Sequence, residues 1–378
     1  MSQKLETILL FALFTSSAVA LADYVFPCYY VYEPATLKPE SIPADLCTHV
    51  IILGCVYEQT NASTANLSRK PYDCSVVLRK LAALKQLNPD LKLVLSMATN
   101  KDAMHSIVSA DATIDAYTSS AIALASQYHF DGIDLDWEYP CGADRFKFTT
   151  LLRNFRAKIS RSSLSLTLSA AIGAGFNTLN LCYDLAGLSL YLDYINVMCY
   201  DYNTIWNTYT AYASPLFARP EETGYDATLN ANFTINYLLE QGVPRAKLVL
   251  GLNAGGHTFQ LTDAAKSRGF HAPVSGVGYS DGWSLYPQLC RLTDTKNDDT
   301  AVVYDDVAEV LYGYYDDQWS NTGDVRSASA KTEWAKSMKL AGVFTWCLNW
   351  DDLFNVCGHN VTFPIHRAIK SGLFPSTR

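Results

Sequence analysis

The stretch DGIDLDWEYP (131–140) places acidic side chains at alternate positions of an apolar run. In a β-strand successive side chains point to opposite faces, and same-face neighbours lie about 6.6 Å apart. One face would then carry Asp134, Asp136 and Glu138, the other would carry Ile133, Leu135, Trp137 and Tyr139, and Asp131 would belong to the turn before the strand. Carboxyl groups this close in a buried site cannot all ionise cheaply, so at least one should hold a proton near neutral pH. The stretch therefore predicts a strand that presents a general acid.

Two other interpretations of this alternation are open at this point. A strand with one wet face in an antiparallel sheet shows the same pattern. Carboxylates also bind Ca²⁺ or Mg²⁺, but three ligands along one strand converge poorly on a single ion. The chain has no CxxC and no Cys/His spacing typical of a zinc site. We therefore expect neither a metal nor a cofactor.

Strand-like and helix-like patterns alternate along the chain. Short apolar, β-rich runs occur at 24–32, 48–55, 92–97, 132–138, 164–171, 194–201, 247–252 and 342–346. Apolar residues at helical spacing occur at 75–87 and 146–159. This order predicts a parallel sheet with right-handed crossovers. Eight strands allow a closed (β/α)8 barrel, and a doubly wound open sheet is the alternative that periodicity alone leaves open.

Residues 259–325 interrupt this rhythm between the seventh strand and the seventh helix. The interval is too long and too aromatic for a loop, and it contains β-like pieces such as VAEVLYGYYD (307–316). We expect a small α+β subdomain on the rim where barrel enzymes carry their active-site loops. The barrel would then comprise residues 23–258 and 326–378.

The N-terminus has the pattern of a secretory signal over residues 1–22. Lys4 precedes an apolar run at 8–14, which is too short to span a bilayer, and small residues end at Ala22. Ten cysteines suggest disulfides in an oxidising compartment. Glycosylation sequons occur at Asn61, Asn66, Asn232 and Asn360. We expect a secreted protein, with a lysosomal location as the alternative.

The net charge of −8 is spread without long runs of one sign. Nothing is basic enough to indicate a nucleic-acid partner or an anionic membrane surface. We expect a monomer that binds neither nucleic acid nor a membrane.

DGIDLDWE resembles the DxxDxDxE signature of glycoside hydrolase family 18, the chitinase family. The resemblance extends over nearly the whole mature chain and implies the closed barrel with its α+β insertion. It is carried further by CYYVYE (28–33), LCTHVII (46–52), LSLTLSAAIGAG (164–175), YINVMCYD (194–201), SPLF (214–217), KLVLGL (247–252) and GVFTWCLNWDD (342–352).

The resemblance implies retaining hydrolysis in which the 2-acetamido group of the substrate acts as nucleophile. Glu138 would be the acid and base, Asp136 would hold the acetamido N–H, and Asp134 would share a proton with Asp136. Tyr200 would donate to the acetamido oxygen. The resemblance further implies that chitin or a chito-oligosaccharide contacts Met198, Asp201, Trp346, Trp206, Tyr139, Tyr29 and Asn100.

Some cleft positions depart from the family pattern. Asn100 replaces a stacking tryptophan, Gly54 replaces an aromatic residue, and Gly255 replaces a cleft tyrosine, whereas His257 is a side chain that some members have. Each missing ring would remove about 0.5–1.5 kcal/mol of binding free energy in addition to the contribution of its buried area. The binding of long polymers would therefore be weaker. Three hypotheses follow: a chitinase with an altered cleft, a chitinase-like lectin with little turnover, or an enzyme that acts on the chitobiose core of N-glycans.

The cysteines divide into three groups. The resemblance implies the pairs Cys28–Cys47 and Cys290–Cys357. Loop proximity suggests Cys55–Cys74 and Cys141–Cys182. Cys199 and Cys347 would be buried thiols, and because each neighbours a cleft residue on its strand, each should face the helix layer.

Overall fold

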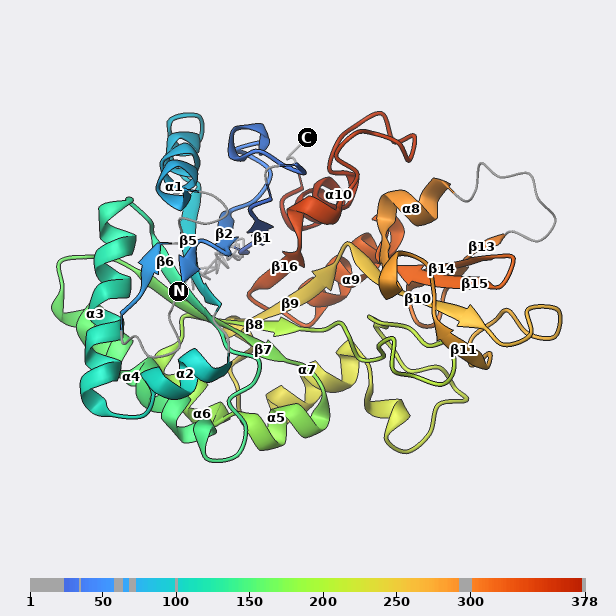
Figure 1. Ribbon diagram of the computed structural model, residues 1–378, viewed down its shortest axis with the longest axis horizontal. Helices are drawn as coiled ribbons and strands as arrows, with labels where there is room; N and C mark the ends of the chain where they lie inside the picture. Colours follow the sequence, from blue (N-terminus) through green and yellow to red (C-terminus); the bar gives the residue numbers. More distant parts are fainter. Residues whose placement is uncertain are drawn as a thin grey trace, which may run out of the picture.

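A closed barrel of eight parallel strands forms the centre of the described part of the chain in the computed structural model (Figure 1). The structure describes residues 24–33, 35–57, 64–67, 73–98, 101–291 and 301–375, so the expected signal peptide, Asn61 and Asn100 lie outside the described residues. Around the barrel the strands are β1 (Pro27–Val31), β2 (His49–Leu53), β5 (Lys92–Ala98), β6 (Gly132–Asp136), β7 (Thr167–Gly173), β8 (Tyr194–Met198), β9 (Leu248–Asn253) and β16 (Gly342–Trp346). β16 pairs with both β9 and β1, which closes the barrel and excludes the open sheet.

Helices follow the barrel strands and cover the outside of the barrel (Figure 1). They are α1 (Cys74–Ala83), α2 (Lys101–Ile107), α3 (Asp111–Gln127), α4 (Asp144–Arg161), α5 (Phe176–Cys182), α6 (Leu185–Tyr191), α7 (Ala231–Glu240), α9 (Val325–Ser337) and α10 (Pro364–Leu373). The helical spacing in 146–159 has its expected consequence in α4, which buries Phe148, Leu151 and Phe155. A short antiparallel pair, β3 (Val56–Tyr57) and β4 (Asn66–Leu67), lies after β2.

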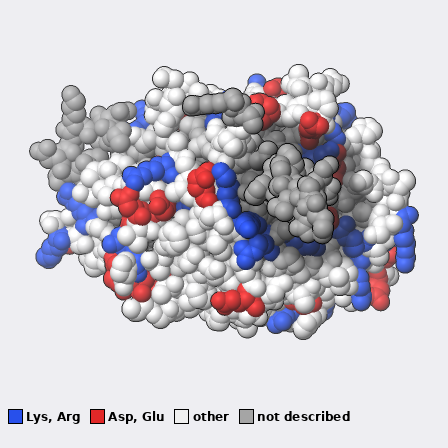
Figure 2. Space-filling view, turned by 180° about the vertical axis from the view of Figure 1, so that it is seen from behind, with Lys and Arg blue, Asp and Glu red and all other residues white. Residues whose placement is uncertain are grey.

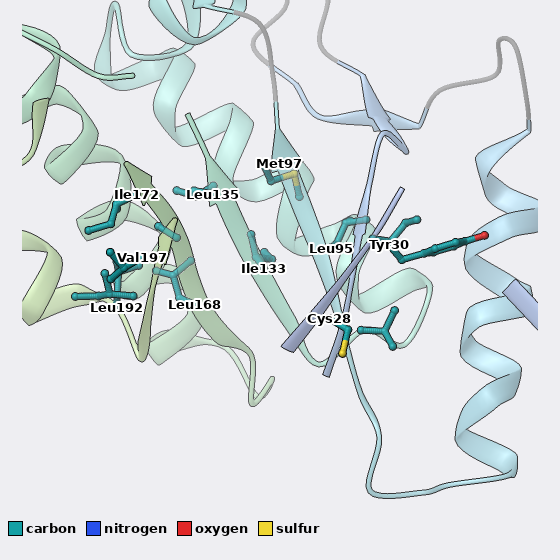
Figure 3. Close-up of a cluster of buried hydrophobic side chains, with 14 of the residues drawn as sticks. Cys28, Tyr30, Leu95, Met97, Ile133, Leu135, Leu168, Ile172, Leu192 and Val197 are labelled. Carbon is teal, nitrogen blue, oxygen red and sulfur yellow. The ribbon is translucent and has the colours of Figure 1, made fainter. Parts of the chain in front are cut away.

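The core has two layers because each barrel strand alternates its side chains. Outward-facing residues such as Cys28, Leu95, Ile133 and Leu135 pack between the strands and the helices (Figure 3). Inward-facing residues form a separate cluster inside the barrel, made of Val25, Tyr29, Ile51, Val94, Ala171, Met198, Val249, Phe344 and Cys347. The alternation in β6 therefore sends its apolar residues to the helices and its acids to the barrel interior, as the sequence pattern predicted.

A second sheet lies beside the barrel and begins at Gly255, directly after β9 (Figure 1). It contains β10 (Gly255–Leu261), β11 (Val274–Val277), β12 (Trp283–Leu285), β13 (Ala301–Asp305), β14 (Val310–Tyr315) and β15 (Gln318–Thr322), with the helix α8 (Tyr286–Cys290). All its pairings are antiparallel, and β10 contacts β11, β12 and β15. Because β9 and β10 are nearly continuous, this sheet is held directly against the mouth of the barrel.

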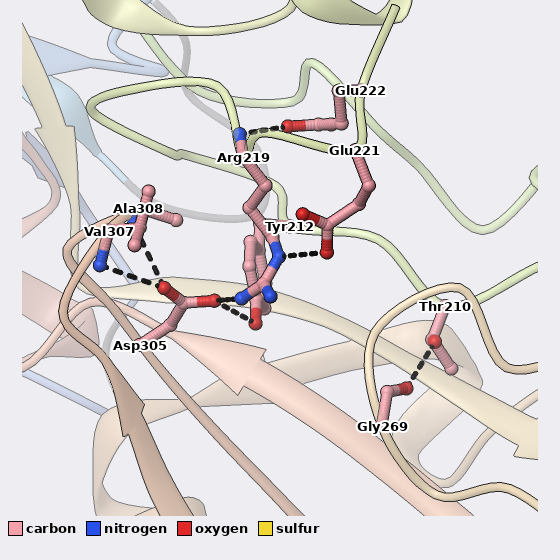
Figure 4. Close-up of polar contacts among 9 residues, drawn as sticks. All are labelled: Thr210, Tyr212, Arg219, Glu221, Glu222, Gly269, Asp305, Val307 and Ala308. Atoms are coloured by element: carbon pink, nitrogen blue, oxygen red, sulfur yellow. Dashed lines mark hydrogen bonds and ion pairs between the residues drawn. The ribbon is translucent and has the colours of Figure 1, made fainter.

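A buried polar cluster connects this sheet to the loop that follows β8 (Figure 4). The Arg219 guanidinium donates to the carboxylate of Asp305, which also accepts from the Tyr212 hydroxyl at 2.8 Å. The Arg219 guanidinium also lies over the Phe270 ring, 5.2 Å from its centroid. Burial raises the pKa of the Asp305 carboxyl, but hydrogen bonds from the Ala308 amide, Tyr212 and Arg219 outweigh it, so the pKa lies below its usual range.

All ten cysteines are described, and eight of them form disulfides. The pairs are Cys28–Cys47, Cys55–Cys74, Cys141–Cys182 and Cys290–Cys357, which are the expected pairs. Cys199 and Cys347 are buried free thiols.

The expected direction of one free thiol was wrong. Cys199 packs with the helix-facing core, as expected, but Cys347 packs with the interior cluster. The reason is that β16 ends at Trp346, so the strand alternation does not continue to Cys347.

The molecular surface has mixed charge. On the face in Figure 2, basic and acidic side chains are interspersed among uncharged residues. None of the described helices is long and apolar enough to cross a membrane. Within the described ranges, no cluster of three or more His, Cys, Asp or Glu residues has a metal-binding arrangement.

Candidate active site

A pocket opens at the end of the barrel where the strands finish. Side chains from β1, β6, β7, β8, β12 and β16 and from the residues that follow β6 and β8 line it: Tyr29, Asp136, Glu138, Tyr139, Ala171, Met198, Tyr200, Asp201, Trp283 and Trp346. The barrel thus brings together residues that are separated by up to 317 positions in the chain, and β12 of the second sheet adds one wall.

Three acids descend from the pocket into the barrel. Asp134 is 0% exposed and Asp136 is 8% exposed, whereas Glu138 is exposed at the open end. β6 ends at Asp136, so Glu138 stands in the bend beyond the strand. The order of depth is the one that the sequence pattern predicted.

Asp134, the deepest acid, is held by four donors. Its Oδ1 accepts from Ser169 Oγ at 2.6 Å and from Asn196 Nδ2 at 3.3 Å. Its Oδ2 accepts from Tyr29 Oη at 3.0 Å and from Ser96 Oγ at 3.2 Å. Burial raises the pKa of the Asp134 carboxyl, while these hydrogen bonds oppose the rise.

Asp136 has a different environment. Burial, together with the charges of Glu138 and Asp134, raises the pKa of its carboxyl well above the usual value. Its Oδ1 is buried and has no hydrogen-bond partner among the described residues. The expected sharing of a proton with Asp134 has no hydrogen bond to support it, because the oxygens of Asp134 are occupied by the four donors. The free Oδ1 is available to accept from a ligand.

Glu138 is the acid that a ligand reaches first. Although its side chain is accessible from the pocket, the surrounding protein still raises its pKa by desolvation. A hydrogen bond from Tyr139 opposes this rise in the pKa, and the charge of Asp201 adds to it. A raised pKa keeps a larger share of Glu138 protonated near neutral pH, which is what a general acid needs.

Tyr139 lines the pocket, so the helix-facing orientation that strand alternation implied for it was wrong. The strand ends before Tyr139, and the period of two ends with it. Trp137 does face the helices, where its ring packs edge-on to Phe148 at 5.8 Å.

The end of β8 supplies a second group of pocket residues. Met198 and Tyr200 line the pocket, and the Tyr200 ring packs against Phe344. Asp201 lies 2.9 Å from His257 Nε2, and His257 Nδ1 faces the Gly282 carbonyl at 3.3 Å. His257 on β10 therefore connects Asp201 to the second sheet.

Aromatic rings complete the pocket. Trp346 lines it as expected, and its ring lies 5.7 Å from the Tyr29 ring. Tyr29 has two roles, because it both lines the pocket and donates to Asp134. Trp283 was not predicted: it is 44% exposed and belongs to the inserted sheet, where no local pattern marks it as a cleft residue.

Other predicted residues lie elsewhere. Trp206 is 83% exposed and is not among the residues that line the pocket. Gly54 has φ +82°, a left-handed conformation that favours glycine, so its backbone explains the absence of a ring there. Of the sequon residues, Asn360 is exposed, Asn232 is half-buried in α7, and Asn66 lies in β4.

Comparison with known proteins places the chain. The model of glycosyl hydrolases family 18 matches residues 25–351. The chain is 31% identical over 360 residues to probable chitinase 10 of Drosophila melanogaster. The aligned region covers 88% of this chain but only 15% of that longer protein.

Solved structures of both active and inactive relatives share the fold. An immunomodulatory active chitinase from Trichuris suis superposes with a TM-score of 0.86 at 28% identity, covering 93% of this chain and all of that one. Human YKL-39, described as a pseudo-chitinase with retained chitooligosaccharide binding, superposes with a TM-score of 0.85 at 25% identity over 93% of this chain and 99% of its own. The chain belongs to glycosyl hydrolases family 18.

Proposed function

We propose that this protein is a chitinase-type glycosidase that cleaves β-1,4-linked N-acetylglucosamine chains by retaining, substrate-assisted catalysis. The observation that carries the proposal is the column of acids. Glu138 at its open end is accessible and has a raised pKa, and Asp136 below it has a raised pKa and a buried Oδ1 without a hydrogen-bond partner among the described residues. A lectin site needs neither a displaced pKa at its mouth nor a buried acid left without a partner.

The residues have distinct tasks in this mechanism. Glu138 gives its proton to the glycosidic oxygen as the bond to the anomeric carbon breaks. The acetamido oxygen of the same sugar attacks that carbon and forms an oxazolinium ion, while Asp136 Oδ1 accepts a hydrogen bond from the acetamido N–H. Tyr200 donates to the acetamido oxygen. Glu138, now ionised, takes a proton from the water that opens the oxazolinium ring, which restores the starting state and retains the configuration.

The proposal includes secretion. Four disulfides are typical of an oxidising compartment. The apolar run at residues 8–14 after Lys4 supports the same location.

A chitooligosaccharide-binding lectin is the second candidate. It is favoured by the likeness to YKL-39 and by the position of Trp206, which stands outside the pocket lining. Against it, this chain retains every acid of the DxxDxDxE pattern, including Glu138.

Hydrolysis of a fluorogenic chitobioside and chitotrioside tests the proposal. We expect turnover by the parent protein and a loss of about 10²–10⁴-fold in kcat for Glu138→Gln, because the acid that protonates the leaving oxygen is removed. The Glu138→Gln variant should still bind N-acetylglucosamine oligomers in calorimetry. Glu240→Gln, the same substitution at an exposed position on α7, is the control and should behave as the parent does.

Sugar binding without turnover in the parent would refute the enzyme and establish the lectin. Chitin oligomers and an N-glycosylated peptide, compared by product analysis, separate chitin-type substrates from the chitobiose core of N-glycans. Faster cleavage of the glycopeptide would replace the proposed substrate.

A further inference from the structure

Trp350 packs against two of the tryptophans that line the candidate pocket. The centroid of its ring lies 5.6 Å from that of Trp283 and 6.1 Å from that of Trp346, edge-on to the latter at 85°. Trp350 is half-buried and is not among the described residues that line the pocket. It therefore packs behind Trp283 and Trp346 without lining the pocket itself.

Gly255 makes room for this ring. A Cβ atom at position 255 would lie 2.6 Å from Trp350 Cε3 and 2.9 Å from the Ser284 carbonyl oxygen. Both distances are shorter than a carbon atom tolerates, so a larger residue at this position would displace the indole. Position 255 lacks the cleft tyrosine of the family, and a tryptophan packs against the backbone of β10 there instead.

Trp283 and Trp346 have few other ring contacts. Trp283 is 44% exposed, and besides Trp350 its ring packs against His257 at 5.0 Å. Besides Trp350, the Trp346 ring packs against Tyr29. Removing Trp350 would leave each ring with one aromatic neighbour fewer and with more rotational freedom, which ligand binding would then have to restrict.

We propose that Trp350, seated on Gly255, is a positioning residue that holds Trp283 and Trp346 in place and thereby sets the affinity of the pocket for a sugar ring. The inference rests on the proposed function, because a pyranose is the ligand whose apolar face fits flat indole rings. It also explains how this chain retains an aromatic wall although Gly255 has no side chain.

Steady-state kinetics with the fluorogenic chitotrioside tests this role in Trp350→Leu. Leucine keeps an apolar side chain but removes the ring contacts, so we expect KM to rise by about tenfold. We expect kcat to stay within about threefold of the parent value, because Trp350 is not among the described residues that line the pocket with Asp136 and Glu138. Trp350→Phe, which retains a ring, should recover most of the lost affinity.

Trp334→Leu is the matched control. Trp334 is a half-buried tryptophan on α9 whose ring packs on Phe217, and it lies outside the pocket lining. Its substitution should leave KM unchanged, with thermal unfolding measured on all variants to separate stability from binding. A parental KM in Trp350→Leu, or an equal rise in Trp334→Leu, would overturn the proposal.

A double-mutant cycle with Gly255→Ala gives a second test. The new methyl group presses on both Trp350 and Ser284, and only the Ser284 contact remains when Trp350 is leucine. We expect Gly255→Ala to raise KM at least about threefold more in the parent than in Trp350→Leu. Equal effects in the two backgrounds would refute the coupling.

Failure of the proposed function gives a different result from failure of this inference. A parent that neither cleaves nor binds N-acetylglucosamine oligomers refutes both. A parent that acts on them, but whose KM and oligomer affinity do not respond to Trp350→Leu, refutes only the role of Trp350.

Discussion

At the scale of single residues, the pocket sets two acids apart by their surroundings. Asp134 is buried among four hydrogen-bond donors, whereas Asp136 is buried with one oxygen unpartnered. Burial alone therefore does not distinguish them. The difference is the supply of donors to Asp134 and the charges of Glu138 and Asp134 beside Asp136, which raise the pKa of Asp136 further, while its Oδ1 remains free to accept from a ligand.

The pH dependence of activity should respond in opposite directions to two neighbours of Glu138. The charge of Asp201 raises the pKa of Glu138, so Asp201→Asn should lower that pKa and move the alkaline limb of kcat/KM to lower pH. The hydrogen bond from Tyr139 lowers the pKa of Glu138, so Tyr139→Phe should move this limb to higher pH. Profiles of kcat/KM against pH measure both shifts, and displacement of both variants in the same direction would contradict the assignment of Glu138 as the acid.

Replacement of Asp136 by asparagine should abolish activity and raise the melting temperature. The folded-state pKa of Asp136 is raised, so above about pH 4 the unfolded chain releases this proton while the folded protein retains it, and stability falls as pH rises. Asp136→Asn removes this cost and should raise the melting temperature by roughly 2–4 °C at pH 7 while activity is lost. The gain should vanish below about pH 4, where the carboxyl is protonated in both states. An equal gain at pH 3 would show that its origin is not ionisation.

At the scale of elements, the second sheet is attached to the barrel by specific contacts in addition to the continuous chain. β10 follows β9 directly, and Arg219 ties the loop after β8 to the end of β13 through Asp305. The sheet then carries Trp283 on β12 to the pocket and presents His257 to Asp201. The position of the sheet thus determines one wall of the site.

Arg219→Ala should weaken this attachment. The change leaves the nearly buried Asp305 carboxylate without its cation and removes the contact with Phe270, so we expect a loss of about 1–3 kcal/mol in unfolding free energy. Urea denaturation measures the loss. Arg326→Ala, which breaks an exposed ion pair with Asp306, is the control and should cost less than about 1 kcal/mol. Equal costs would mean that burial adds nothing to the Arg219 contact.

At the scale of the whole molecule, a disulfide joins the inserted sheet to the end of the barrel. Cys290, the last residue of α8, pairs with Cys357 after β16, and the bridge closes a loop of 67 residues. Because α8 directly follows β12, the bridge also restrains the strand that carries Trp283.

Removal of this bridge should lower global stability. For Cys290→Ala combined with Cys357→Ala, the length of the closed loop predicts a loss of about 4 kcal/mol. Cys199→Ala removes a buried thiol that bridges nothing and should cost about 1 kcal/mol. Denaturant unfolding of both variants under oxidising conditions provides the measurement, and similar losses would indicate that loop closure contributes little.

Much of the barrel could be predicted because its signals are local. Each of the eight strand-like runs corresponds to a barrel strand, and 342–346 agrees with β16 at both ends. The predicted starts at 24 and 164 lie three residues before β1 and β7. At the other end of the strands, β6 stops two residues before Glu138, and β8 stops at Met198. There the period of two ends, which is why Tyr139 and Cys347 face directions that alternation did not predict.

The sequence by itself determined the column of acids, because the pleat of a strand converts a spacing of two residues into a shared face and an order of depth. Only the tertiary structure decided the wall around that column. Trp283, Trp350 and Gly255 meet through an antiparallel pairing of β10 with β12 and the closure of the barrel at β16. These residues are far apart in the chain, and a short-range sequence pattern does not indicate contacts between distant segments. The residues that form this wall are therefore identified only by the tertiary packing.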